Sequence, residues 1–395
     1  MTLATAIGCA MVLTSFATAL FAYILYPLVL TLLSARRVPA NRGSESENQW
    51  PVVSLVLPVY NEERTIADTL ESLLAVDYPP GRRQILVVSD ASTDRTDEIV
   101  RRYKVHGVEL HRLPARRGKT AAENTSRTLL RGEIVVNTDA SVRVRQDALK
   151  PLVAAFRDPS VGVASGRDVS VGPSGHPRGA GESGYVSYEM WVRDLETRAG
   201  GIVGASGCFF ASRPVLHREI VPEALSRDFA APLIAREHGY RAVSVPEAIC
   251  YVPRTTSLRQ EYRRKVRTML RGLETLYHKR SLLNPLRYGT FALKLWSHKL
   301  IRWLVPWAAL GAVAGLGLIA VEVSPLRWIL LVGCAGVAAT MTLAWWWPSD
   351  RGMPAILAAP SYVLFGLMAG LHAWFKALAG DLNPVWEPTR REAVP

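Results

Sequence analysis

An uncharged stretch near the start of the chain restricts the fold more than any other feature of the sequence. It runs from Ala4 to Leu33 and contains only apolar and small polar residues. A helix crosses the hydrocarbon core of a bilayer in about 20 residues, and this stretch is longer than that. A cleaved signal peptide would begin with basic residues, and Met1-Thr2-Leu3 supplies none. The sequence therefore predicts a retained membrane helix over residues 1–34.

Further apolar spans predict membrane helices in the C-terminal part of the chain, over residues 300–380. Their tryptophans lie near the span ends, where indole rings prefer the boundary between lipid and water. Hydrophobic residues make up 49% of the chain, which fits a division into a soluble part and a membrane part. The spans are Trp303–Val321, Trp328–Trp347 and Ala355–Ala379.

Basic residues indicate on which side of the membrane the middle of the chain lies. Because basic flanks stay in the cytoplasm, we expect a multi-pass protein of the plasma membrane with a cytosolic middle region. Four complete crossings would place the basic C-terminal tail outside, so an interfacial position for one C-terminal segment stays open. The basic residues that flank the first two spans are Arg36, Arg37, Arg42, Lys299 and Arg302.

The formal net charge of +13 leaves two classes of partner open, nucleic acid and anionic lipid. A cytosolic domain held against anionic headgroups explains the excess, so we expect membrane lipids as partners and no nucleic acid. The cysteines show no paired metal-ligand spacing, so neither a zinc site nor a disulfide framework is expected.

The region between Pro51 and Arg254 alternates short β-branched runs with helical patterns, which is typical of βαβ units and a mostly parallel sheet. The first run, VVSLVLPVY, is apolar on both faces, as a central parallel strand should be. Asn61 follows it, and we expect Asn61 to cap the next helix. Two later runs, QILVVSDAS and GEIVVNTDAS, predict strands that end at Asp90 and Asp139.

These strand ends place polar side chains at one edge of the predicted sheet. Open α/β sheets bind ligands in the crevice at the carboxyl ends of their strands. Tyr60, Asn61 and Glu62 supply a ring, an amide and a carboxylate, which can stack on and hydrogen-bond a nucleoside. The alternative for Asn61 and Glu62 is structural, a helix cap and a favourable first-turn acid. The coincidence with Asp90 and Asp139 favours the ligand site.

The order of four segments gives the sequence a specific resemblance. VVSLVLPVYNEERTI, VVSDASTDRTDEIV, RRGKTAAENT and VVNTDASV follow one another along the chain. In this order they resemble family 2 glycosyltransferases of the GT-A fold, in particular the membrane-bound synthases related to cellulose, chitin and hyaluronan synthases. The resemblance extends to the flanking membrane helices and the tail VWEPTRR.

That resemblance implies an α/β GT-A domain with a Rossmann-like, mostly parallel sheet in the cytosol, between N-terminal and C-terminal transmembrane helices. The division of the chain that we expect is a membrane helix (1–34), a linker (35–50), the GT-A domain (51–254), amphipathic interfacial helices (255–299), C-terminal membrane helices (300–380) and a basic tail (381–395).

The resemblance also implies which residues bind the donor, a nucleotide-diphospho sugar and in particular a UDP-sugar. Lys119, in the segment Arg117-Gly118-Lys119, would supply charge near the phosphates, and Gly118 would allow close approach of the backbone. A basic surface loop is the alternative for that segment. The residues expected to hold the base and ribose are Pro58, Tyr60, Glu62 and Asp90.

The segment TDAS takes the place of the family's Asp-x-Asp metal motif. Asp139 is the expected first ligand of Mg²⁺ or Mn²⁺, whose shell the substrate diphosphate and water would complete. Ser141 occupies the second position with a neutral oxygen, which departs from the stricter pattern. A turn residue at the end of a strand is the alternative for Asp139.

Two further segments resemble the acceptor side of the family's site. In GASGCFFASRP, the small residues Gly204, Ser206 and Gly207 would leave room for a sugar ring, with a tight strand connection as the alternative. In LSRDFAAPL, Asp228 is the expected catalytic base, which takes the proton from the acceptor hydroxyl. Arg227 stands where relatives have a second acid, and a cation there would lower the pKa of Asp228.

The segment SLRQEYRRKVRTMLRGLETLY predicts an amphipathic helix with a basic stripe. It resembles the family's Gln-x-x-Arg-Trp element, with Gln260 and Arg263 matching and Arg264 in place of the tryptophan. Guanidinium groups suit a leaving diphosphate because they bind phosphate oxygens bidentately. For Arg259 and Arg271, contact with anionic headgroups is nearly as well supported. The stripe consists of Arg259, Arg263, Arg267 and Arg271.

Together these features predict an inverting glycosyltransferase. It would transfer a sugar from a nucleotide-diphospho sugar to a growing polysaccharide or a lipid-linked glycan at the cytosolic face of the membrane. Two alternatives stay open. One is a single-sugar transferase acting on a lipid carrier, and the other is a non-catalytic, membrane-anchored subunit that binds a nucleotide sugar.

Overall fold

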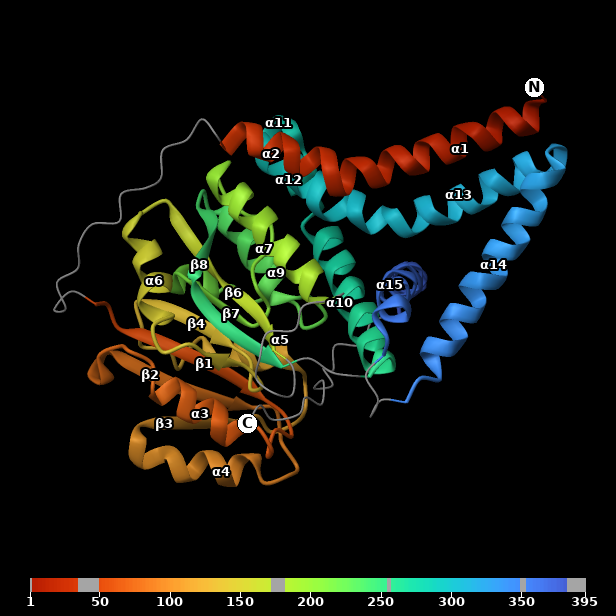
Figure 1. Ribbon diagram of the computed structural model, residues 1–395. Coiled ribbons are helices and arrows are strands. Elements are labelled where there is room, and N and C mark those ends of the chain that lie inside the picture. Colours follow the sequence, from red (N-terminus) through yellow and green to blue (C-terminus); the bar gives the residue numbers. More distant parts are fainter. Residues whose placement is uncertain (1, 35–49, 172–181, 254–256, 349–352, 382–395) are drawn as a thin grey trace.

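The computed structural model describes residues 2–34, 50–171, 182–253, 257–348 and 353–381. The expected linker and basic tail lie almost entirely outside the described residues, as do Arg36, Arg37 and Arg42. Within the described part, an α/β domain lies beside a group of long apolar helices (Figure 1).

The α/β domain is built around one sheet with the strand order β3-β2-β1-β4-β7-β6-β8-β5. β1 is buried throughout and pairs in parallel with β2 and β4, with Val53 opposite both Arg83 and Ile134. β7 runs antiparallel to both of its neighbours, whereas β6 and β8 pair in parallel. The expected α/β class and mostly parallel sheet are confirmed. The strands are β1 (Val53–Val59), β2 (Arg83–Ser89), β3 (Val108–Arg112), β4 (Ile134–Thr138), β5 (Arg143–Val144), β6 (Val161–Val171), β7 (Phe209–Ser212) and β8 (Arg241–Pro253).

Helices cover both faces of the sheet because β1 presents apolar side chains to both. Leu55 and Leu57 pack with Leu70 of α3 in one core cluster, and Val56 packs with Ala122 of α5 in another. The helices of the domain are α3 (Ile66–Leu74), α4 (Thr96–Arg102), α5 (Lys119–Ser126), α6 (Leu149–Ala154), α7 (Glu182–Arg198), α8 (Pro214–His217) and α9 (Arg227–Glu237), with short 3₁₀ turns at Pro80–Arg82, Tyr103–His106 and Ala155–Arg157.

The expectation that Asn61 caps the helix after β1 is wrong. α3 begins at Ile66, and its N-cap is Thr65. Asn61 adopts a left-handed backbone conformation with φ 53°, which its short polar side chain tolerates better than most residues. Its side-chain oxygen accepts a hydrogen bond from the Thr93 backbone NH at 2.7 Å. Asn61 therefore links the loop after β1 to the loop after β2.

The membrane spans expected from the sequence are present as helices, within a few residues of their expected bounds. Four helical segments of the described chain are long and apolar enough to cross a membrane. The first consists of α1 (Leu3–Leu20), a π-helical turn η1 (Phe21–Leu25) and α2 (Tyr26–Ser34), and the others include α13 (Arg302–Glu322), α14 (Ser324–Trp345) and α15 (Ala355–Leu378). The elements that connect the domain to α13 are α10 (Leu258–His278), a 3₁₀ turn (Arg280–Leu283), α11 (Pro285–Tyr288), α12 (Thr290–Leu295) and the π-helical turn η7 (Trp296–Ile301).

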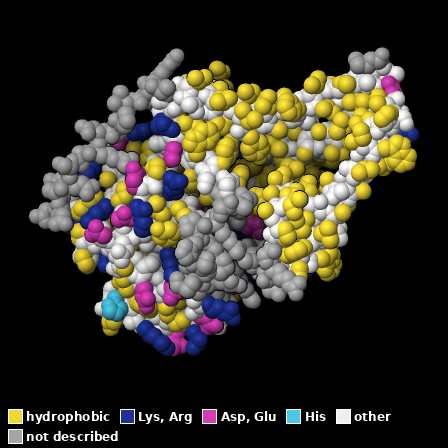
Figure 2. Space-filling model, in the orientation of Figure 1, with side chains coloured by type: hydrophobic (Ala, Val, Ile, Leu, Met, Phe, Trp, Pro, Cys, Tyr) yellow, Lys and Arg dark blue, Asp and Glu magenta, His cyan; other side chains and the backbone are white. Residues whose placement is uncertain are grey.

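α1 and α13 lie side by side along their length (Figure 1). Small residues allow their backbones to approach closely, since a Cβ added to Gly8 would lie 2.6 Å from the Gly315 carbonyl oxygen. α15 instead packs along α10. In Figure 1, α15 is seen nearly end-on, whereas α1 and α13 run across the view, so α15 crosses them at a steep angle. In Figure 2, hydrophobic side chains cover these helices, whereas charged side chains gather on the α/β domain.

Candidate active site

Asp90 follows β2 and holds the loop that begins α5. Its Oδ1 accepts the backbone NH of Arg117 at 2.7 Å, and its Oδ2 accepts that of Gly118 at 2.8 Å. Gly118 has φ 101°, a conformation that glycine adopts without a steric penalty. Charge-assisted hydrogen bonds of this kind are about twice as strong as neutral ones, so Asp90 fixes the loop firmly at the sheet edge. The expected contact of Asp90 with the base stays a prediction.

The loop after β1 carries the other residues predicted to hold the nucleoside. Pro58 is buried within β1, and Tyr60 lies just beyond its end. The guanidinium carbon of Arg116 lies 3.8 Å from the centroid of the Tyr60 ring, a cation–π contact. The backbone NH of Glu62 donates to Thr96 Oγ1 at 2.8 Å. Arg116 directly precedes the segment Arg117-Gly118-Lys119, but no pattern in the sequence identifies it as the partner of Tyr60.

Lys119 lies at the centre of the candidate site. Its ammonium nitrogen is 2.5 Å from Asp139 Oδ1 and 3.2 Å from the Gly207 carbonyl oxygen. Burial by itself would lower the pKa of Lys119, but the neighbouring carboxylates, Asp139 first among them, outweigh burial and raise the pKa above its usual range. Lys119 is therefore a stable positive charge between the end of β4 and the expected acceptor loop.

The TDAS segment offers one carboxylate to a metal ion. The backbone NH of Val142 donates to the Asp139 carbonyl oxygen at 3.2 Å, so Asp139 and Ser141 belong to one tight turn. Across the described residues, no group of three or more His, Cys, Asp or Glu side chains could hold a metal ion. This donor set fits a divalent cation that takes most of its ligands from a diphosphate and water.

The expected acceptor loop, residues 204–207, is fixed by Ser206. Its hydroxyl donates to Asp168 Oδ1 at 2.5 Å and accepts the backbone NH of Cys208 at 3.1 Å. Gly204 lies against Lys299 of η7, because a Cβ at Gly204 would be 3.0 Å from Lys299 Cε. The loop therefore contacts both the domain, through Asp168, and η7, which leads into the apolar helix α13.

Asp228, the predicted base, lies in the first turn of α9 and faces this loop. A Cβ added to Gly207 would lie 2.8 Å from Asp228 Oδ2, so the carboxylate occupies space that a larger residue at 207 would take. The Ser226 hydroxyl donates to Asp228 Oδ1, which holds the carboxylate in this position. Since the Gly207 carbonyl oxygen also accepts from Lys119, the structure brings the predicted base and the predicted phosphate-binding lysine next to the same residue.

Arg227, which stands where relatives have a second acid, pairs with Glu123 inside the domain. Its Nε lies 3.6 Å from Glu123 Oε2, and its Nη1 donates to the His217 carbonyl oxygen at 3.2 Å. Burial raises the pKa of Glu123, whereas Lys119 and Arg227 act in the opposite direction. The sequence could not reveal this pairing because Glu123 and Arg227 lie on different helices.

Arg271 is bonded to the domain, so the headgroup alternative for this residue is wrong. Its guanidinium donates to Thr120 Oγ1 at 2.7 Å and to the carbonyl oxygens of Glu223 and Leu225. Burial lowers the pKa of Arg271, and the charge of Asp228 partly opposes this. Arg271 thus joins the start of α5 to the loop before the predicted base.

The other predicted residues of α10 occupy different surroundings. Arg264 forms a bidentate ion pair with Glu261 on its own helix, at 2.7 and 2.8 Å. Arg259 lies over the rings of Trp345 and Trp346 at 5.2 Å. Gln260 and Arg263 are exposed and Arg267 is half-buried. Their roles toward a leaving diphosphate stay predictions.

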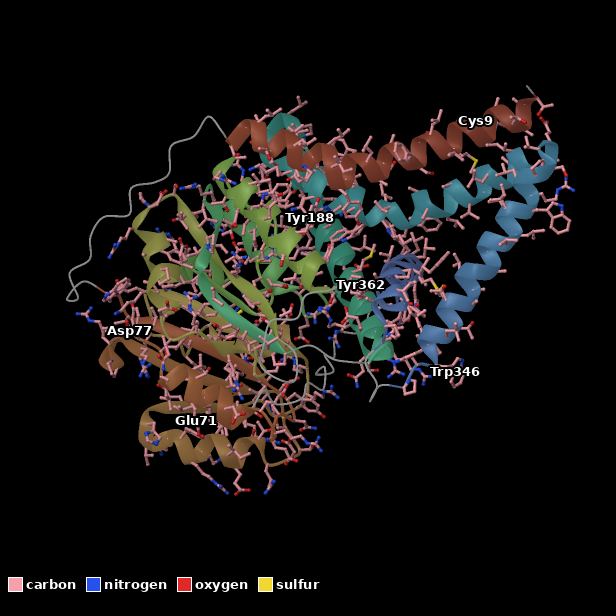
Figure 3. All side chains as sticks on the ribbon, viewed as in Figure 1. Cys9, Glu71, Asp77, Tyr188, Trp346 and Tyr362 are labelled. Atoms are coloured by element: carbon pink, nitrogen blue, oxygen red, sulfur yellow. The ribbon has the colours of Figure 1, made fainter. Side chains whose placement is uncertain are left out.

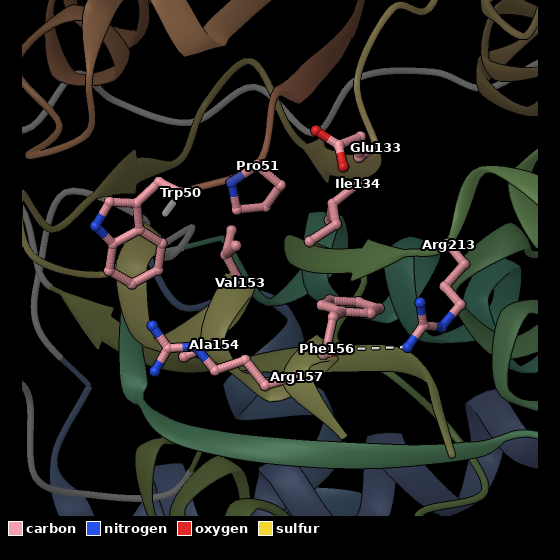
Figure 4. A pocket seen from close by; sticks show the side chains of 9 residues that line it. All are labelled: Trp50, Pro51, Glu133, Ile134, Val153, Ala154, Phe156, Arg157 and Arg213. Atoms are coloured by element: carbon pink, nitrogen blue, oxygen red, sulfur yellow. Dashed lines mark hydrogen bonds between the residues drawn. The ribbon is translucent and has the colours of Figure 1, made fainter. Parts of the chain in front are cut away.

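A cavity of about 280 Å³ opens at the opposite edge of the sheet (Figure 4). Trp50, Pro51 and Glu133 line it just before the starts of β1 and β4, and Arg213 reaches it from the chain after β7. The cavity therefore lies at the amino ends of these strands, whereas ligands of α/β sheets bind at the carboxyl ends. It is separate from the candidate active site.

Comparison with known proteins identifies the part of the chain that carries this site. Residues 54–220 match the family model described as glycosyl transferase family 2. This region is a family 2 glycosyltransferase domain. It contains nearly all of β1 to β7. It also contains the residues before α9 that are predicted to bind the donor or the metal ion.

Two kinds of curated relative match part of the chain. The β-monoglucosyldiacylglycerol synthase of Nostoc sp. is 29% identical over 168 residues, which cover 42% of this chain and 36% of that protein. The poly-β-1,6-N-acetyl-D-glucosamine synthase of Staphylococcus epidermidis is 25% identical over 246 residues, 60% of this chain and 59% of that protein. The chain therefore spans about a third to three fifths of these relatives' length.

A solved structure matches nearly the whole chain in fold. The mannosyltransferase PcManGT from Pyrobaculum calidifontis, in complex with GDP-Man and Mn²⁺, has a TM-score of 0.72 and 23% sequence identity. The match covers 95% of this chain and 99% of that one. The predicted GT-A fold is thereby confirmed.

Proposed function

We propose that this chain is a membrane-embedded, inverting glycosyltransferase that uses a nucleotide-diphospho sugar. The observation that carries the proposal is the placement of Lys119, Asp139 and Asp228 around Gly207, with Asp90 holding the start of α5 beside them. A positive charge for the diphosphate and a carboxylate for the acceptor thus lie next to the same residue. Its family 2 domain supports the same chemistry.

In the proposed reaction, the acceptor hydroxyl approaches from the side of residues 204–207. Asp228 takes its proton while the hydroxyl oxygen forms a bond to the anomeric carbon of the donor sugar. The bond from that carbon to the diphosphate breaks on the opposite side, so the configuration inverts. Lys119 compensates the charge on the departing diphosphate, and Arg271 keeps α5 and the loop before Asp228 in register.

The donor is proposed to carry a divalent cation, Mg²⁺ or Mn²⁺, on its diphosphate. Asp139 would hold the ion, with Ser141 as a neutral neighbour, and the ion would neutralise developing phosphate charge. The complex of PcManGT with GDP-Man and Mn²⁺ supports a metal-bound nucleotide sugar. A UDP-sugar remains our expected donor, and a GDP-sugar is the competing possibility.

The steep crossing of α15 suggests a membrane topology. α1, α13 and α14 would cross the bilayer, and α15 would lie in the cytosolic interface along the amphipathic α10. Three crossings then leave the domain and the C-terminal tail on the same side, which resolves the conflict that four crossings create. The cytosolic plasma-membrane location stays part of this proposal.

A glycan and a lipid are both candidate acceptors. The relatives include a polysaccharide synthase and a glycolipid synthase, and so support either class. Arg264, in place of the family's tryptophan, is bound to Glu261, which favours transfer of a single sugar to a lipid over long-chain synthesis.

The proposal is tested with the purified full chain in lipid nanodiscs. A panel of UDP-sugars and GDP-sugars is offered with Mg²⁺, Mn²⁺ or a chelator, and release of the nucleoside diphosphate is measured. We expect metal-dependent release with one nucleotide class. If no donor is turned over under any condition, although nucleotide sugars bind, the chain is a non-catalytic binding subunit instead.

A further inference from the structure

The pairing of Lys119 with Asp139 occupies one oxygen of the predicted metal ligand. Lys119 is the first residue of α5, and Asp139 directly follows β4. The distance from Lys119 Nζ to Asp139 Oδ1 is 2.5 Å, and the two side chains are 20% and 19% exposed. The pair is therefore open to solvent, but it is shielded enough that water and salt weaken its attraction only in part. A cation that takes this oxygen has to displace the ammonium group.

The charge on Lys119 also acts against a cation at the other oxygen of the same carboxylate. Burial lowers the pKa of Lys119, but Asp139, Glu123 and Asp228 together raise it further, so the side chain stays protonated at neutral pH. A cation bound to either oxygen of Asp139 would lie close to this ammonium group. Like charges repel strongly at short distance in a partly buried site. The site therefore disfavours a divalent cation that arrives by itself.

The second acceptor of Lys119 is weaker than the first. It is the Gly207 carbonyl oxygen, a neutral group 3.2 Å from Lys119 Nζ. An ion pair has a Coulombic attraction that a neutral carbonyl does not supply. An ammonium group without an anionic partner is costly in a partly buried site. Displacement of Lys119 from Asp139 therefore costs free energy unless another anion receives the ammonium group.

A diphosphate group can remove this cost. Its anionic oxygens accept charge-assisted hydrogen bonds from a lysine, and the same oxygens are good ligands for Mg²⁺ and Mn²⁺. Since a lysine side chain is long and flexible, the ammonium group can turn from Asp139 to a phosphate and leave the carboxylate to the cation. One nucleotide thus provides the ammonium group with a new partner and the cation with its remaining ligands.

We infer that Lys119 is an internal counter-ion that keeps Asp139 from binding a divalent cation until a nucleoside diphosphate draws the ammonium group away. The inference rests on the proposed function, in which Asp139 holds the cation and Lys119 compensates the charge of the diphosphate. The cation and the nucleotide then bind in a coupled manner, and each raises the affinity of the other by the same factor. A cation without a nucleotide binds weakly.

The test measures Mn²⁺ binding to the full chain in phosphatidylcholine nanodiscs, from the electron paramagnetic resonance signal of free Mn²⁺. UDP and GDP are added in separate samples, and empty nanodiscs correct for Mn²⁺ that nucleotide or lipid binds. We expect the wild-type protein to bind Mn²⁺ roughly 5- to 150-fold more tightly with one of the nucleotides than without. Lys119→Met and Lys119→Gln should each raise the nucleotide-free affinity by roughly fivefold or more, because the competing charge is gone. Lys119→Arg keeps the charge and should not raise it.

A second lysine–aspartate pair serves as the matched control. Lys150 Nζ lies 2.7 Å from Asp77 Oδ2, and Lys150 is 22% exposed, close to the value for Lys119. Asp77 lies between α3 and β2, at the amino end of that strand, and in Figure 3 it is labelled on the side of the α/β domain away from α14. Lys150→Met should leave the nucleotide-free affinity for Mn²⁺ unchanged. Combining Lys119→Met with Asp139→Asn should abolish the gain of Lys119→Met.

The inference alone is overturned by any of three results. The first is wild-type Mn²⁺ binding that is equally tight with and without nucleotide and is lost in Asp139→Asn. The second is an unchanged nucleotide-free affinity in the uncharged Lys119 variants, and the third is an equal gain in Lys150→Met. If no Mn²⁺ binding depends on Asp139 even with nucleotide, the metal assignment of the proposed function fails, and this inference fails with it. Because the measurement needs no turnover, it can succeed when the donor panel fails, so the two failures are distinguishable.

Discussion

The glycine at position 207 allows the placement of Asp228 to be tested without removing its carboxylate. In Gly207→Ala, the new methyl group would lie 2.8 Å from Asp228 Oδ2, whereas ordinary contact begins at 3.4 Å. The carboxylate must therefore move by about 0.6 Å. Ser226 holds its other oxygen, so the movement comes as a rotation of the carboxylate away from position 207.

The expected loss follows from the size of that movement. A misplacement of about 1 Å costs roughly 10²-fold in rate, so we expect kcat to fall about 10- to 100-fold. This corresponds to about 1.4–2.7 kcal/mol of transition-state stabilisation. Asp228→Asn, which removes the base, should cost roughly 10²–10⁴-fold. The KM for the donor should change little in both variants, because the donor is held by other residues.

The assay is release of nucleoside diphosphate at saturating donor and acceptor, with donor affinity measured separately. Gly81→Ala is the matched control, because a Cβ at that glycine would meet nothing within 4 Å. It should leave kcat within about twofold. If Gly207→Ala kept the wild-type kcat while Asp228→Asn lost activity, the carboxylate would not act from the position seen here. If neither variant lost activity, Asp228 would not be the base.

The remaining predictions concern the metal, α10 and pH. Asp139→Ala should abolish metal-dependent turnover, and unchanged activity with the same metal dependence would remove Asp139 from the metal site. Arg271→Met should lower the melting temperature and kcat through loss of its bonds to the loop before Asp228, whereas Arg259→Met should leave kcat unchanged. Equal losses of kcat in the two variants would show that these Arg271 bonds have no specific role in turnover. The Ser160 hydroxyl and Arg241 lower the pKa of Asp158 to about 2, so its contribution to stability is present above about pH 4 and disappears as pH falls toward 2. The difference in melting temperature between wild type and Asp158→Asn should shrink over that range, and a constant difference would contradict this account.

Much of the donor side could be predicted because it depends on local sequence. A parallel strand buried on both faces reads as an uninterrupted apolar run, so β1, β2 and β4 were recognised with their polar ends. Lys119 and Asp139 meet as a consequence of that topology, since α5 and β4 deliver them to the same edge. The sequence predicts a helix cap at Asn61 because asparagine is favoured both at helix N-caps and at left-handed turn positions, and the structure shows the second of these.

The acceptor side was harder to predict because its contacts join distant segments. Arg271 lies in a periodic basic stripe, and periodicity alone does not tell whether a stripe faces lipid or a protein loop. Arg227 pairs with Glu123, more than a hundred residues earlier, and Lys299 reaches Gly204 from the start of a membrane helix. Each of these contacts joins two segments that are far apart in the sequence, so the residue pattern of either segment alone does not predict it.

The two π-helical turns affect where the apolar helices tolerate the loss of a residue. A π turn holds an extra residue within an otherwise regular helix, and η1 and η7 contact each other where the helices reach the domain. Deleting one residue from Phe21–Leu25 would let a regular helix run through, and α1 and α2 would keep nearly the same relative orientation because the wider turn had accommodated that residue. Deleting one residue from α1 after Gly8 would instead rotate everything before the deletion by about 100° and shift it by about 1.5 Å relative to α2.

The deletion within α1 would leave both ends of this helical segment intact and misalign them. Tyr26 would still donate to Glu196, but Gly8 would turn away from Gly315 and present bulkier neighbours to α13. The extra residue of η1 thus lies between the part of the segment that packs against the α/β domain and the part that packs against α13, and the loss of a residue is tolerated better at this turn than within α1.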